Sequence, residues 1–163
     1  LLPIGDDSID IAYSHGVLHH TPETQIALDE IYRVLKPAGL GVIALYSTWS
    51  PTFLVARAIG TMKSIFTDKY NEWYEEGEQA WKTGGELNPW TKTYSLRELK
   101  NLFSIYDISE LKFRKNGFSW GNAIPKLGKH IENTDLGKKI AGVLDPSLGA
   151  MWIITFKKNI STF

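Results

Sequence analysis

Three histidines lie close together at His15, His19 and His20, and histidine is the side chain best suited to proton transfer near neutral pH. A metal site here is disfavoured, because no acidic or thiol side chain lies at ligand spacing beside them. We consider His19 and His20 as candidate general bases for an acceptor that must lose a proton, such as a phenol or an enol. The alternative is that His20 hydrogen-bonds the backbone at the start of the following helix.

These histidines follow a short β-branched, alternating stretch, Ile9–Tyr13, which predicts a strand. Ser14, His15 and Gly16 come directly after it. In open α/β sheets, ligands bind beyond the carboxyl ends of the strands, so this turn is the natural place for a ligand. Gly16 would let the backbone approach that ligand without an intervening Cβ.

A helix and a second strand must position the turn. Thr21 is predicted to cap the helix and Pro22 to take its first position, because both residue types favour those sites. Pro37–Gly39 is predicted to end the helix. Gly41–Tyr46 is nearly all apolar, as expected of a strand buried in a parallel sheet. Strand, helix and strand form one right-handed βαβ unit.

The rest of the chain holds an insertion and then further regular elements. Residues 47–93 contain two predicted helices, Pro51–Phe66 and Asp68–Lys82, and a connection of this length is usually functional. Its many aromatic residues fit either a lid over an apolar acceptor or simple packing on the sheet edge. The later expected elements are a helix at 96–103 with a Ser95–Glu98 capping box, strand Ile105–Phe113, helix Asp135–Leu144 and strand Met151–Phe156.

Composition limits the classes of function. The 163 residues carry 18 basic and 18 acidic side chains, and this zero net charge argues against a nucleic-acid partner. There is no cysteine, which excludes disulfides and thiolate metal sites and fits a cytoplasmic protein. No apolar run approaches the roughly 18 residues of a membrane span.

Two stretches resemble class I S-adenosylmethionine-dependent methyltransferases of the ubiquinone and menaquinone type. They are Leu2–His20 (LPIGDDSIDIAYSHGVLHH) and Leu28–Gly39 (LDEIYRVLKPAG). The resemblance implies a Rossmann-like α/β fold with helices on both faces of the sheet. This chain would supply strands ordered 4-5-7-6, with the last strand of the sequence antiparallel. Residues 1–163 would be the C-terminal part of one such domain, with 47–93 as a helical substrate lid.

The resemblance also implies a site for S-adenosylmethionine. Ser14, His15 and Gly16 would lie along the methionine and ribose side of the cofactor, and Leu2 and Pro3 near the adenine. The methyl acceptor would be a small molecule of lipophilic or aromatic character. Trp49 and Tyr94 are candidate acceptor-binding residues, although a structural role for the Tyr94 hydroxyl fits the sequence equally well.

Two departures from the family pattern bear on activity. The family's glycine-rich loop would precede Leu1, so we expect this chain to be a C-terminal fragment that is inactive alone. Ala38 stands where the family usually has glycine, at a cost of about 1 kcal/mol if its backbone is left-handed. The alternative function is a non-catalytic module that associates with itself or a partner through the exposed first strand. A dehydrogenase-type Rossmann half fits less well, because the sequence offers no dehydrogenase catalytic set.

Overall fold

The computed structural model describes residues 2–55, 58, 91–119 and 127–160, in two compact units. The first unit comprises Leu1–Tyr46, Lys92–Arg114 and Trp152–Phe163, and the second Ser47–Thr91 and Lys115–Met151. Most of the predicted lid at 47–93 lies outside the described residues. The predicted helix Asp68–Lys82 and the part of Pro51–Phe66 beyond residue 58 are therefore not described.

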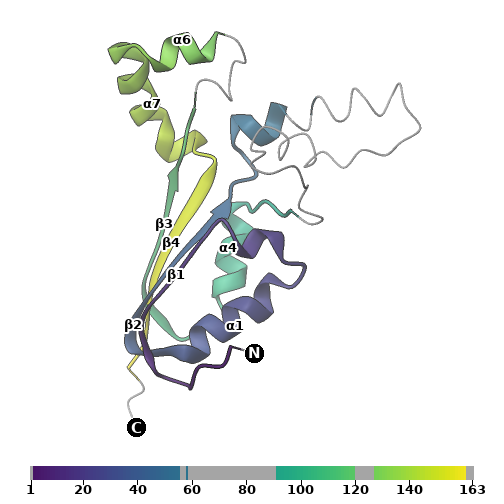
Figure 1. Ribbon diagram of the computed structural model, residues 1–163, viewed down its shortest axis with the longest axis vertical. Coiled ribbons are helices and arrows are strands. Elements are labelled where there is room, and N and C mark those ends of the chain that lie inside the picture. The colour runs from purple at the N-terminus through teal and green to yellow at the C-terminus, as the bar shows by residue number, and fades with distance from the viewer. Residues whose placement is uncertain (1, 56–57, 59–90, 120–126, 161–163) are drawn as a thin grey trace, which may run out of the picture. The chain divides into compact units, whose positions relative to one another are not determined.

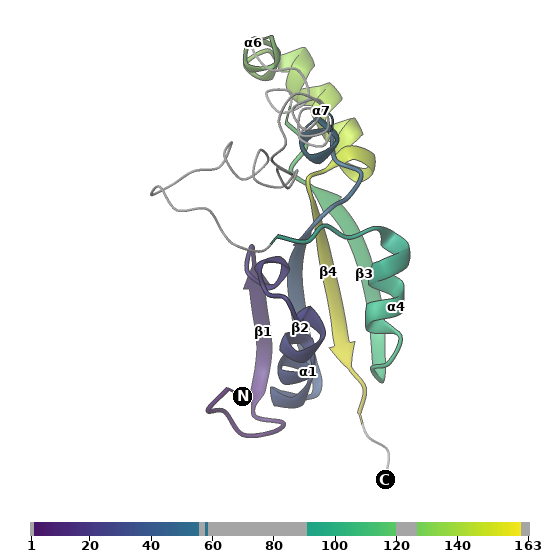
Figure 2. The ribbon, with the colours of Figure 1, turned by 90° about the vertical axis from the view of Figure 1, so that its right-hand side faces the viewer.

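A four-stranded open sheet has the order β1-β2-β4-β3. Its strands are β1 (Ile9–His15), β2 (Leu35–Tyr46), β3 (Ile108–Asn116) and β4 (Met151–Lys158). β1 and β2 pair in parallel, and Figure 2 shows β4 running against β1. This confirms the predicted order 4-5-7-6 with an antiparallel last strand.

Helices α1 (Thr24–Val34) and α4 (Leu96–Phe103) lie on the same face of this sheet (Figures 1 and 2). The resemblance implies helices on both faces, whereas the described helices of this unit cover only one. Large apolar side chains from both helices and from β2 and β4 fill the space between, among them Leu28, Ile43, Leu99, Phe103, Ile154 and Phe156. On β1, Ile11 and Tyr13 remain exposed.

The predicted start of the first helix is wrong by two residues. α1 begins at Thr24 after Glu23, and no side chain caps it. Leu18–His20 instead forms a short 3-10 turn, and the Thr21 hydroxyl donates to the Leu18 carbonyl at 2.8 Å. Thr21 therefore stabilises the turn before the helix rather than the helix itself.

The strand β2 begins earlier than predicted, directly after α1. Ile9 pairs with Leu35 and Ile11 with Leu40, so the intervening residues of β2 form a bulge. Ala38 lies in that bulge with φ 62°, which confirms that the position is left-handed. The Pro37–Gly39 segment thus bends a strand rather than terminating a helix.

The capping box is confirmed. The Ser95 amide donates to Glu98 Oε2 at 2.8 Å, and the Glu98 amide donates to Ser95 Oγ at 3.3 Å. After α4, the amides of Ser104 and Tyr106 bond back to Asn101 and Phe103 carbonyls. This turn delays the next strand, so β3 begins at Ile108 rather than at the predicted Ile105.

The second unit contains a helical segment at 51–55 and the helices α6 (Gly128–Glu132) and α7 (Asp135–Leu148). α7 confirms the predicted helix at Asp135 and extends four residues beyond Leu144, past Pro146. None of the helices in the described part of the chain is long and apolar enough to cross a membrane.

Candidate functional site

The Ser14–Gly16 turn lies where β1 leaves the sheet. Ser14 pairs with Ile43 and His15 with Ala44 in the parallel β1–β2 ladder, so both strands end at the same edge. Gly16 has φ +73°, a conformation that L side chains rarely adopt, and a Cβ built there would meet no atom within 4 Å. The turn therefore presents backbone to open space at the carboxyl edge of the sheet.

His19 lies behind this turn and is completely buried. Its ring centroid is 3.8 Å from that of Tyr46 and 4.2 Å from that of His20. Neither ring nitrogen has a hydrogen-bond partner among the residues that the structure describes. Burial, followed by the nearby charge of His20, lowers the pKa of His19 to about 3.

These properties separate the two candidate bases. His19 is neutral near pH 7, but a pKa of about 3 makes it a weak base, and its burial keeps it from an external acceptor in this conformation. His20 is partly exposed on the same turn. The assignment of either residue as a catalytic base stays a prediction.

Backbone and side-chain hydrogen bonds hold the turn against residues far along the chain. The Lys92 amide donates to the His19 carbonyl at 2.8 Å, and the Tyr94 amide to the Tyr46 carbonyl at 2.8 Å. The Tyr94 hydroxyl donates to Thr24 Oγ1 at 2.7 Å, within the core. Tyr94 therefore joins α1 to the end of β2, and its burial raises the pKa of its hydroxyl.

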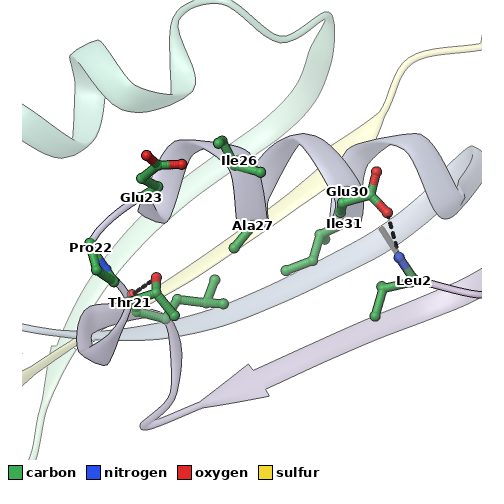
Figure 3. Close-up of a pocket in the computed structure, with 9 residues that line it drawn as sticks. Leu2, Thr21, Pro22, Glu23, Ile26, Ala27, Glu30 and Ile31 are labelled. Atoms are coloured by element: carbon green, nitrogen blue, oxygen red, sulfur yellow. Dashed lines mark hydrogen bonds between the residues drawn. The ribbon is translucent and has the colours of Figure 1, made fainter.

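A pocket of about 680 Å³ runs along α1 and lies wholly within the first unit (Figure 3). One end is formed by the turn that carries Leu18, Thr21 and Pro22, and Leu2 lies toward the other end, beside Glu30. Most of the remaining wall is helical, from Glu23, Ile26, Ala27, Glu30 and Ile31. The pocket is thus mainly apolar, with carboxylates at its rim.

Charged contacts fix Leu2 at this pocket. Its amide donates to Glu30 Oε2 at 2.9 Å, and Arg33 binds the same carboxylate oxygen at 2.9 Å. Arg33 also donates to the Ile4 carbonyl at 2.9 Å. The hydrogen bonds from Arg33, and then that from Leu2, lower the pKa of Glu30 to about 2. The carboxylate therefore stays ionised and anchors the segment before β1.

The predicted site residues are only partly brought together. Ser14, His15 and Gly16 share the carboxyl edge of the sheet. Leu2 instead lies in the pocket along α1. Pro3 is exposed and does not line that pocket. Trp49 belongs to the second unit, where 58% of its surface is exposed. Within the described ranges, no three potential metal-ligating side chains gather.

The sequence reading missed the outer face of α1 as a pocket wall. Ala27 and Ile31 line the pocket and also pack partly against the core. The available signal was Ile26, an apolar residue one helical turn before Glu30 on the same side of the helix.

Comparisons with known proteins agree on one family. Residues 1–43 match the sequence profile of a methyltransferase domain. An uncharacterised methyltransferase of Mycobacterium bovis is 42% identical over 52 residues, which are 32% of this chain and 20% of that protein. A demethylmenaquinone methyltransferase of Streptomyces avermitilis is 33% identical over 100 residues, covering 53% of this chain and 41% of that protein.

Solved structures extend the likeness to the whole chain at the level of fold. A SAM-dependent methyltransferase of Thermotoga maritima superposes with a TM-score of 0.58 at 18% identity, covering 98% of this chain and 60% of the other. One from Archaeoglobus fulgidus gives a TM-score of 0.52 at 13% identity, covering 95% and 62%. The chain spans between 20% and 62% of the length of these four proteins. The resemblance drawn from the sequence is confirmed.

Proposed function

We propose that this chain, which carries part of the class I S-adenosylmethionine-dependent methyltransferase fold, belongs to an enzyme that methylates a small molecule. One observation carries the proposal: the glycine turn Ser14–Gly16 opens at the shared carboxyl edge of the parallel pair β1 and β2. This is the place where open α/β sheets bind their ligands. The turn also lies inside the stretch that matches the methyltransferase-domain profile.

The residues at this edge fit a cofactor of that kind. Gly16 leaves open space where a side chain would stand, and Ser14 and His15 offer polar groups beside it. Away from this edge, along α1, Leu2 gives an apolar wall that we assign to the adenine ring, and Pro3 follows it in the chain. When bound, S-adenosylmethionine supplies an electrophilic methyl group on its sulfonium. The chain's part is to orient that group toward an acceptor and to exclude water.

A lipophilic quinol is the acceptor class that we propose. Two relatives, the Streptomyces enzyme and a 2-methyl-6-phytyl-1,4-hydroquinone methyltransferase of rice, are named for acceptors of this type. A hydroxylated ring must lose a proton around the transfer, and His20, partly exposed on the turn, is placed to accept it. His19 would orient His20 through their ring contact. Trp49 would contribute an apolar surface within the lid at 47–93.

Titration of S-adenosylhomocysteine into the full-length gene product tests the proposal, with Gly16→Asn as the variant. Asparagine tolerates a left-handed backbone but fills the open space, so affinity should fall at least ten-fold while the melting temperature hardly changes. Gly5→Asn is the matched control, because its Cβ position is also open and its backbone is not left-handed. Absence of binding by the folded wild-type protein would refute the proposal.

We propose further that the 163-residue chain does not sustain the reaction alone and that the enzyme is cytoplasmic. The basis of the first statement is that the chain spans 41% of the Streptomyces enzyme and 60% of the Thermotoga structure. The same titration on the 163-residue chain tests the first statement: binding of comparable affinity to the full-length product would contradict it. Cell fractionation tests the second.

A second candidate function is a non-catalytic module that associates through β1. This strand has a neighbour on one side only in the described sheet, and 69% of the surface of Tyr13 is exposed on it. Exposed strand edges pair readily with other strands. Light scattering on the chain would show a dimer that Tyr13→Lys dissociates. A monomer at all accessible concentrations would remove this candidate.

A further inference from the structure

The carbonyl of Leu18, two residues after Gly16, accepts three hydrogen bonds. The Thr21 amide donates to it at 3.2 Å and the Thr21 hydroxyl at 2.8 Å (Figure 3). The Thr24 hydroxyl donates to the same oxygen at 3.1 Å. Since a carbonyl oxygen has two lone pairs, a third donor leaves it little freedom to turn. The peptide that joins Leu18 to His19 is therefore held in one direction.

A second hydroxyl decides where the Thr24 hydroxyl donates. The acceptors near Thr24 Oγ1 among the described residues are both carbonyl oxygens, that of Leu18 at 3.1 Å and that of Thr21 at 3.4 Å. A carbonyl oxygen cannot donate, so the one proton of Thr24 goes to one of them, and Leu18 is the closer. The Tyr94 hydroxyl lies 2.7 Å from Thr24 Oγ1 and must therefore be the donor in that pair.

Tyr94 is itself fixed at both backbone groups. Its amide donates to the Tyr46 carbonyl at 2.8 Å, and its carbonyl accepts from Trp152 Nε1 at 2.9 Å. Only 2% of Tyr94 and 5% of Thr24 is exposed, so their hydrogen bond is shielded from water, where such bonds are strongest. The end of β2 and the start of β4 thereby set the position of the Thr24 hydroxyl.

This use of two threonines leaves α1 without a side-chain cap. Threonine just before a helix commonly caps its first amides. Among the described residues no side chain caps α1, whose N-cap position is Glu23. The Thr21 and Thr24 hydroxyls bind the Leu18 carbonyl instead. Such departures from a local preference are expected where a functional site requires a particular geometry.

We propose that Thr24 is a positioning residue for the cofactor turn Ser14–Gly16. It acts through the Leu18 carbonyl, which fixes the path of the chain that leaves this turn. The Lys92 amide holds the next carbonyl, that of His19, at 2.8 Å, so the segment is ordered before a ligand arrives. A site ordered in advance loses less conformational entropy on binding. The inference rests on the proposed function and adds to it a residue that controls cofactor affinity from within the core.

Titration of S-adenosylhomocysteine into the full-length gene product, with Thr24→Val and Thr24→Ser, tests the proposal. Valine has the shape of threonine without its hydroxyl, and one hydrogen bond changes an equilibrium constant by up to about ten-fold, so Thr24→Val should weaken binding roughly three- to ten-fold. Thr24→Ser keeps the hydroxyl and should bind almost as well as the wild type. Ile154→Val is the matched control, because it removes a buried methyl group from the same unit and should lower stability without changing affinity.

A double variant separates positioning from stability. Thr24→Val removes the acceptor of the buried Tyr94 hydroxyl, and adding Tyr94→Phe removes that hydroxyl too. Replacing both partners of a buried hydrogen bond by apolar groups is less destabilising than removing one. The double variant should therefore regain part of the lost melting temperature but still bind weakly. Affinity that recovers together with the melting temperature would show a purely structural role and overturn the proposal, as would wild-type affinity in Thr24→Val.

Hydrogen exchange gives a measurement that needs no ligand. The Thr21 amide, bonded to the Leu18 carbonyl, should exchange roughly three- to ten-fold faster in Thr24→Val and at the wild-type rate in Ile154→Val. Unchanged exchange in Thr24→Val would contradict the positioning role even if affinity falls. Absence of binding by the folded wild-type protein would instead refute the proposed function, and the exchange rates alone would then decide whether Thr24 holds the turn.

Discussion

Replacing Ala38 by glycine should stabilise the first unit, although the change removes a methyl group. Ala38 is exposed in the β2 bulge at φ 62°, so no packing is lost. A left-handed backbone costs an L-residue roughly 1–2 kcal/mol. The greater freedom of glycine in the unfolded chain offsets roughly 0.5–1 kcal/mol of that gain. The net stabilisation should be about 0.5–1 kcal/mol, and the melting temperature should rise by about 1–4 °C.

Urea unfolding followed by circular dichroism measures this change, because a shift of the midpoint at constant slope reports stability. Ala27→Gly is the matched control in the same unit. Ala27 lies inside α1, where glycine costs about 1 kcal/mol relative to alanine. The same chemical substitution should therefore move the two midpoints in opposite directions.

A lower midpoint for Ala38→Gly than for the wild type, with Ala27→Gly destabilised as expected, would refute the reasoning. It would mean that the bulge does not hold residue 38 in the left-handed region in solution. Equal midpoints for the wild type and Ala38→Gly would mean that the strain is relieved by the neighbouring turn.

Three further changes probe the core and the turn. Tyr94→Phe removes the buried hydrogen bond to Thr24 and should cost about 1 kcal/mol in urea unfolding. Gly41→Ala should cost roughly 1–3 kcal/mol, because its Cβ would lie 2.3 Å from the Phe156 ring; Phe156→Leu should recover part of that loss in a double-mutant cycle. His19 has a folded-state pKa of about 3, below its ordinary value of 6.5, so its contribution to stability is present above pH 6.5 and is lost as the pH falls toward 3. Urea titrations at pH 7, 6 and 5 should show stability falling by up to about 1.4 kcal/mol per unit from this residue, and His19→Phe should remove that part of the slope.

Each of these predictions has a contrary outcome. A Tyr94→Phe midpoint equal to that of the wild type would mean that the buried hydroxyl contributes nothing net. Strictly additive effects of Gly41→Ala and Phe156→Leu would show that the two residues are not in contact. For the pH series, His130→Phe is the control for replacing an exposed histidine by phenylalanine. An identical slope in His19→Phe would show that His19 is accessible to protons in the folded state.

The βαβ unit and the helix α4 could be predicted from the sequence because their signals are local. The apolar run before Tyr46 and the Ser95–Glu98 capping box act over a few residues, and the structure contains both. The predicted starts of α1 and β3 were less accurate, because a hydrogen bond in the structure competes there with the conformation that the residue types favour. Thr21 bonds to the Leu18 carbonyl instead of capping α1, and the turn after Phe103 delays β3. Residue type alone does not decide between such partners.

The sequence by itself determined the family resemblance, the strand order and the position of Gly16 directly after a parallel strand. The resemblance rests on residue identities, and the strand order is what that resemblance implied. The position of Gly16 follows from the alternation of apolar and polar residues that marks the strand before it. Only the tertiary structure decided that His19 is buried, that Leu2 is anchored by Glu30, and that Tyr94 bonds to Thr24. These contacts join residues 28 to 70 positions apart in the chain or depend on burial, which packing of the whole unit creates. A histidine exposed in the unfolded chain becomes a neutral, desolvated side chain only when β2 and the Leu18–His20 turn enclose it.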